Sequence, residues 1–111
     1  MNRFLVAGLL AVAPAVAMAH HGAFLYDVKK LTTIEGQLTD VKWGFPHITA
    51  KMNVQGKTWK LVFAPAGVLL EGGITEQMLT SAKTVKILGA PRKDGTQEMR
   101  ASIQTIDGKK P

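Results

Sequence analysis

The sequence predicts a small all-β domain, and three observations support this fold class. Apolar and polar residues alternate over several short stretches, which is the period of a half-buried strand. Glycine-containing turns separate these stretches, as they do in antiparallel sheets. The chain has 111 residues, which is enough for one modest hydrophobic core. We therefore expect one folded domain rather than two.

The first predicted strand covers residues 31–43, "LTTIEGQLTDVKW". Ile34 and Leu38 fall on the same face of a strand with period two. The next apolar residue is Val41, so the alternation shifts by one position after Leu38. A β-bulge near Asp40 would absorb this shift and bend the strand. The pattern therefore predicts one long, bent first strand.

Four more strands and a short helix are predicted to follow. The strands are residues 47–54, 58–63, 84–90 and 99–106. Glycine-containing turns at 55–57 and 93–95 join them into two hairpins. The stretch "PAGVLLEGG" predicts a helix that begins at Pro65, and Thr75 is expected to cap a second helical turn. Five strands with a helix between the third and fourth match a small five-stranded Greek-key barrel of the OB type. A small sandwich is the alternative.

Residues 1–19 have the layout of a secretory signal peptide. One basic residue precedes a short apolar run, Pro14 interrupts that run, and small residues in an A-x-A pattern follow. We expect cleavage before His20, although a cut before Met18 also fits the pattern. The apolar run is too short for a stable membrane span. The sequence therefore predicts a periplasmic domain of residues 20–111 without a membrane span.

Composition excludes several classes of function. The chain has no cysteine, so it has neither disulfides nor a thiolate metal site. Its formal net charge is +6, but the basic residues form scattered pairs rather than a dense run. We therefore expect a solvated basic face and no nucleic-acid partner. The sequence has no phosphate-binding glycine loop and no nucleophile elbow, so we do not expect an enzyme.

The histidines provide the main functional hypothesis. Cleavage before His20 would leave a free α-amine that can chelate one metal ion together with the ring Nδ1 of the same residue. An imidazole from His47 or His21 would complete a planar set of three nitrogens, the arrangement called a histidine brace. Such a set suits copper. Zinc prefers four tetrahedral ligands, and Asp27 or Glu35 is a candidate for the fourth.

The aromatic residues and methionines divide into two groups. Trp43 and Phe45 flank the Pro46-His47 turn and are predicted to form a wall beside that histidine. The other group has the strand spacing of core residues and comprises Met52, Trp59, Phe63 and Met99.

Four stretches, "AHHGAF", "VKWGFPHI", "APAGVLLEGG" and "GAPRKDG", resemble an uncharacterised family of small exported bacterial proteins. In that family a His-His pair follows the signal peptide, and a strand ends in a Trp-x-x-Pro-His motif. The resemblance covers nearly the whole mature chain. It implies the fold and export, and it implies no particular activity.

The sequence therefore predicts a periplasmic monomer that binds one copper ion through His20 and His47, with His21 as a third candidate ligand. Its role would be to carry, buffer or deliver the metal. The alternative is a metal-free binding module of the cell envelope. In that case an aromatic or basic barrel face would hold a glycan, an anionic ligand or an envelope protein.

Overall fold

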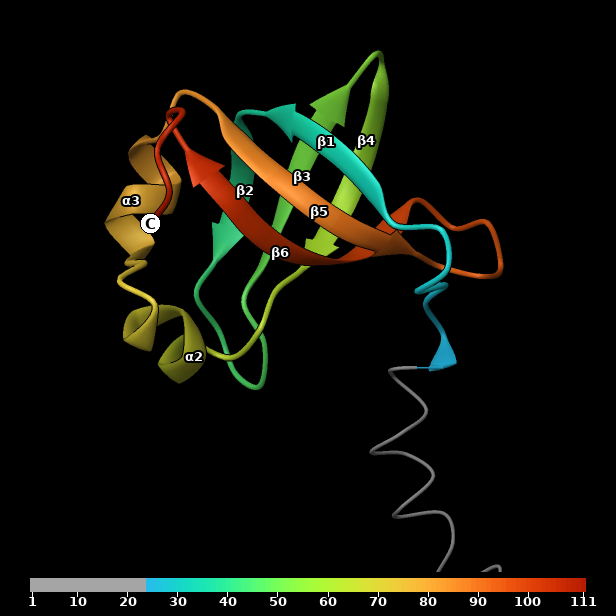
Figure 1. Cartoon of the computed structure of the whole chain (residues 1–111), viewed down its shortest axis with the longest axis horizontal. Coiled ribbons are helices and arrows are strands. Elements are labelled where there is room, and N and C mark those ends of the chain that lie inside the picture. The colour runs from blue at the N-terminus through green and yellow to red at the C-terminus, as the bar shows by residue number, and fades with distance from the viewer. Residues whose placement is uncertain (1–23) are drawn as a thin grey trace, which may run out of the picture.

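The computed structural model describes residues 24–111, in which six strands form one mixed sheet beside two short helices (Figure 1). The predicted signal peptide, His20 and His21 lie outside these residues. The elements are β1 (Thr32–Gly36), β2 (Leu38–Lys42), β3 (Thr49–Val54), β4 (Lys57–Val62), α2 (Ala66–Glu71), α3 (Glu76–Ser81), β5 (Val85–Pro91) and β6 (Glu98–Ile106). The predicted all-β class is confirmed.

The strand order in the sheet is β1-β5-β6-β4-β3-β2. Neighbouring strands are antiparallel except β4 and β6, which are parallel. The two edge strands, β1 and β2, are therefore consecutive in the chain. Figure 1 shows the sheet strongly curled, with β1 and β5 crossing in front of β3. The sheet is not closed into a barrel, so the five-stranded OB-like barrel is not confirmed.

The sheet has six strands rather than five because the predicted first strand divides at Gln37. Its first half pairs with β5 and its second half pairs with β3, at opposite edges of the sheet. A Cβ on Gly36 would lie 3.2 Å from Cγ of Met52, so glycine lets the chain pass close to β3 at this point. The predicted bulge is confirmed, because the β2–β3 register shifts beside Asp40, whose φ is 49°.

The predicted tight turn between β3 and β4 is also confirmed. Val54 pairs with Lys57, which leaves two residues in the turn. Both have positive φ, 52° at Gln55 and 79° at Gly56. Two consecutive positive φ angles match the right-handed twist of the strands that the turn joins.

Two helices, rather than one, lie between β4 and β5. Gly73 has a φ of 82° and follows the end of α2. The side chain of Thr75 then accepts a hydrogen bond of 3.2 Å from the backbone N–H of Met78 and caps α3. The predicted second helical turn is therefore a helix of its own, and the expectation of a single helix is wrong.

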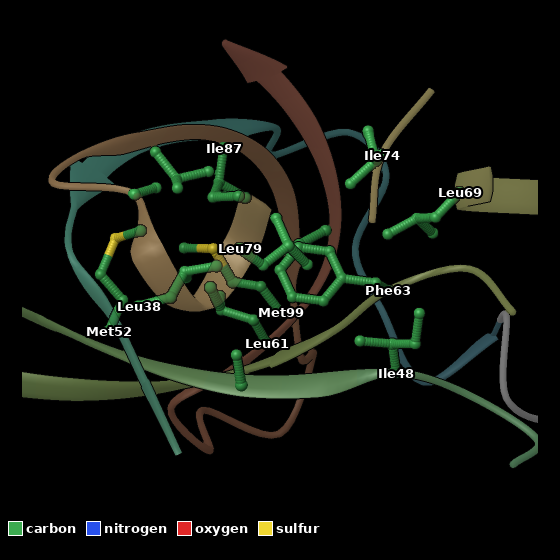
Figure 2. Close-up of a cluster of buried hydrophobic side chains, with 14 of the residues drawn as sticks. Leu38, Ile48, Met52, Leu61, Phe63, Leu69, Ile74, Leu79, Ile87 and Met99 are labelled. Atoms are coloured by element: carbon green, nitrogen blue, oxygen red, sulfur yellow. The ribbon is translucent and has the colours of Figure 1, made fainter. Parts of the chain in front are cut away.

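The core lies inside the curl of the sheet, and the helices cover one end of it (Figures 1 and 2). Figure 2 shows Leu61, Leu79 and Met99 close together at its centre. Met52 and Met99 are both fully buried, as their spacing predicts. Burial of one such side chain contributes about 1.5–3 kcal/mol. Each helix adds one buried leucine, Leu69 from α2 and Leu79 from α3.

Candidate functional site

His47 lies in the loop that joins β2 to β3, and its side chain is exposed. The next residue, Ile48, is buried, and its carbonyl accepts a 2.8 Å hydrogen bond from the backbone N–H of Phe63. The end of the loop is therefore held against the end of β4. Within residues 24–111, no hydrogen bond or ion pair engages the His47 ring. Its nitrogens therefore have no partner among the described residues.

His47 also lines an open hollow of about 450 Å³, which we call the head hollow. The rest of its lining comes from the start of β1, the end of β4, β5 and β6. These residues are Leu31, Val62, Phe63, Ala64, Pro65, Leu88, Arg100, Ala101 and Ser102. Phe63 and Ala101 are buried, whereas Arg100 and Ser102 are exposed. The hollow is therefore lined by side chains from both faces of the sheet.

Arg100 places a positive charge in this hollow. It lies opposite Val62 on β4 and opposite Ala90 on β5, so its neighbours across the sheet are apolar. No carboxylate of the described residues forms an ion pair with it. The head hollow thus combines apolar walls with a guanidinium group that has no ionic partner among residues 24–111.

A second, smaller hollow of about 170 Å³ lies between α2 and β6, and we call it the tail hollow. Its lining is apolar apart from Ser102, and it includes Val68, Leu69 and Ile103. The two hollows share four lining residues, which are Phe63, Ala64, Ala101 and Ser102. They are therefore adjacent, and we refer to the two together as the depression.

The described residues supply only part of the predicted metal site. No group of three or more histidine, aspartate or glutamate side chains within residues 24–111 is arranged to hold a metal ion. Asp27 accepts a hydrogen bond from the N–H of Lys29, and Glu35 is exposed on β1. Neither carboxylate lines the head hollow beside His47.

The model of a family of unknown function, DUF6152, matches residues 8–101. The chain belongs to the DUF6152 family. This membership agrees with the predicted resemblance to an uncharacterised family. No curated protein and no solved structure matches the chain. Neither helix in the described part of this DUF6152 chain is long and apolar enough to cross a membrane.

In this DUF6152 chain the aromatic residues beside His47 do not form the predicted wall. Trp43 is half-buried and packs against the core, whereas Phe45 is 97% exposed. Neither of them lines the head hollow. The two residues predicted to pack do so, since Phe63 is buried and Trp59 lies against the core.

A second polar cluster, which sequence reasoning missed, lies at the start of β6 in this DUF6152 chain. Tyr26 Oη donates a 2.5 Å hydrogen bond to Glu98 Oε2, and Arg92 Nη1 lies 3.5 Å from the same oxygen. Burial first, and then the hydrogen bond to Glu98, raises the pKa of Tyr26 to about 12. These partners are far apart in the sequence, so no linear motif marks them.

This cluster anchors the first described residues to the β5–β6 hairpin. Asp27 N–H donates to the carbonyl of Pro91 at 2.7 Å, and Lys93 N–H donates to the carbonyl of Leu25 at 2.8 Å. Tyr26 also pairs with Arg92 as an isolated β-bridge. The side chains of Tyr26 and Arg92 both contact Glu98, so the cluster holds residues 25–27 against the hairpin.

Proposed function

We propose that the mature DUF6152 protein is a periplasmic, monomeric copper-binding protein. His20 would supply its amine and ring nitrogen, His47 the opposing imidazole, and His21 a third candidate nitrogen. The protein would carry, buffer or deliver the metal and would not act as an enzyme. The observation that supports this proposal is the ring of His47, which has no partner within residues 24–111 and lies at the surface on a loop that is tied to the sheet.

The anchoring of residues 25–27 sets a condition on the proposal. A metal bridge between His20 and His47 has to span from the hairpin that holds Tyr26 to the β2–β3 loop, and these two segments lie apart in Figure 1. The four residue-to-residue steps from His20 to Phe24 span at most about 14 Å when fully extended. We propose copper rather than zinc because three nitrogen ligands are sufficient for copper, whereas zinc prefers four tetrahedral ligands.

The proposal is tested with mature protein that begins at His20, after mass spectrometry has established this N-terminus. Titration of this protein with Cu(II) would be monitored by calorimetry and by electron paramagnetic resonance. We expect one ion per chain, with nitrogen ligands from more than one imidazole. One glycine added before His20 should weaken binding strongly, and so should His47→Ala. Phe45→Ala is the matched control, because it changes an exposed residue of the same loop that has no donor atom.

Two results would overturn the copper proposal. One is unchanged affinity after the glycine extension, because an ordinary histidine site does not need the free amine. The other is unchanged affinity in the His47→Ala variant, because the metal would then be held by the N-terminal residues alone.

A metal-free binding module of the cell envelope is the second candidate function. It is favoured by Phe45, a large apolar side chain that is 97% exposed. Binding of envelope extract proteins to the wild type, with loss of that binding in Phe45→Ser, would support this candidate. Equal capture by both variants would contradict it.

We also propose that the curled sheet is a variant of the OB-like barrel. The strand order supports this, since β1 and β2 are two halves of one continuous segment that serves both edges. An experimental structure in which backbone hydrogen bonds join β1 to β3 would establish closure. A wide, water-filled gap between these strands would exclude it.

A further inference from the structure

We propose that the depression formed by the head and tail hollows binds a small carboxylate anion with an apolar tail, which is the chemistry of a medium-chain fatty acid. The carboxylate would pair with Arg100, and the tail would lie against α2 and β6. This inference goes beyond the copper proposal and does not depend on residues 20 and 21.

The charge of Arg100 is the first argument. Two basic residues on nearby strands have acidic partners, since Lys51 lies 3.4 Å from Asp40 and Lys60 lies 4.0 Å from Glu98. Arg100 has no such partner among the described side chains. A guanidinium group presents a planar pair of N–H donors that matches the two oxygens of a carboxylate. The head hollow therefore favours an anion of this shape.

The polarity of the depression changes along β6, and this is the second argument. Arg100 lines only the head hollow, Ala101 and Ser102 line both hollows, and Ile103 lines only the tail hollow. The order along the strand is thus charged, small, and then large and apolar. A ligand that is charged at one end and apolar at the other fits this order in one direction only.

The size of the depression also fits such a ligand. The head hollow alone, at about 450 Å³, lies within the range of about 300–1,000 Å³ that is usual for small-molecule sites. Val68 is 57% exposed at the mouth of the tail hollow, so a tail that covers it removes apolar surface from water. Each additional buried methylene group should tighten binding about fourfold.

The experiment uses the metal-free mature protein with decanoate below its micelle concentration. Calorimetry would give the affinity, and ¹⁵N-labelled protein would show which amide resonances shift. We expect one decanoate per chain, with shifts at residues 63–68 and 100–103. Affinity should rise from hexanoate to octanoate to decanoate. Decanol and decyltrimethylammonium serve as neutral and cationic probes with the same tail, and they should bind much more weakly.

Two variants locate the ends of the ligand. Arg100→Gln should weaken decanoate binding about tenfold or more, because it removes a charge-assisted hydrogen-bonding partner. Val68→Asp should weaken binding by placing a carboxylate where the tail lies. Lys86→Gln is the matched control, because Lys86 is an exposed cation on β5 that lines neither hollow. Its affinity for decanoate should equal that of the wild type.

The site assignment is overturned if decanol binds as tightly as decanoate, if Arg100→Gln binds decanoate normally, or if no amide shifts are seen along residues 100–103. A glycine added before His20 should leave decanoate binding unchanged. The copper proposal can therefore fail while this one holds, and the reverse is also true.

Discussion

The phenol of Tyr26 donates a 2.5 Å hydrogen bond to Oε2 of Glu98, a residue that lies 72 positions later in the chain. Arg92, the residue that follows β5, contacts the same carboxylate oxygen. The bond ties the first described residues to the start of β6. Because the chain contains a single tyrosine, this link can be followed by spectroscopy without interference from other phenols.

Stability should fall at high pH as Tyr26 ionises. Its pKa is raised to about 12 in the folded protein, and the unfolded value lies near 10. The folded state therefore holds this proton more tightly than the unfolded state. The resulting stabilisation is fully present below pH 10 and is lost as the pH rises from about 10 to about 12. Absorbance of tyrosinate at 295 nm should titrate near pH 12 in folded protein, whereas a midpoint near 10 would contradict the burial of the phenol.

Tyr26→Phe should destabilise the protein by about 1–2 kcal/mol. The substitution keeps the ring but removes the donor to a half-buried carboxylate, which then loses one of its partners. Urea unfolding measures the change. Thr58→Ala, on the exposed face of β4, is the control and should stay within about 0.5 kcal/mol of the wild type. Equal stability of Tyr26→Phe and the wild type would show that the bond makes no net contribution.

Gly89→Ala should destabilise the protein by about 1–3 kcal/mol through overpacking. A Cβ at this buried position would lie 2.6 Å from Sδ of Met99, which is itself fully buried. Thermal unfolding measures the loss. Gly67→Ala is the matched control, because a Cβ there meets nothing within 4 Å and the residue lies in α2. That control should be neutral or stabilising, by up to about 1 kcal/mol.

Thr75→Ala should cost about 1 kcal/mol because it removes the side chain that caps α3. Thr75→Ser keeps the hydroxyl and should restore most of the stability. Amide exchange of Met78, whose N–H is the capped donor, should become faster in the alanine variant only. Unchanged exchange at Met78 would show that the cap does not hold the first turn of the helix.

Much of the sheet could be predicted because one of its faces is buried. Alternation identified Ile34, Leu38, Met52 and Met99 as core residues, and all four are buried. The break at Gln37 could not be predicted for a physical reason. Ile34 and Leu38 are an even number of positions apart, so both halves of the segment keep the same period across the break. The division depends on where β5 and β3 lie, which local sequence does not encode.

The candidate site was predicted only in part. His47 drew attention because it follows Pro46 at the start of a strand, and it does lie at the surface. The hollow that it lines has no linear signature, because the lining comes from five separated segments. Arg100 occupies an outward strand position that any polar residue can fill. Only the structure shows that Arg100 lines the same hollow as Val62 and Leu88.

The pairing of the first edge strand has a consequence for the order of folding. Thr32 pairs with Gly89, and β5 in turn pairs with β6, which ends only a few residues before the C-terminus. Closing such distant contacts is slow, because a long loop must be ordered before any contact compensates for the lost entropy. β1 therefore finds its partner strand only after β5, about 50 residues later in the chain, has been synthesised. Until then β1 lacks the strand with which it pairs in the folded sheet.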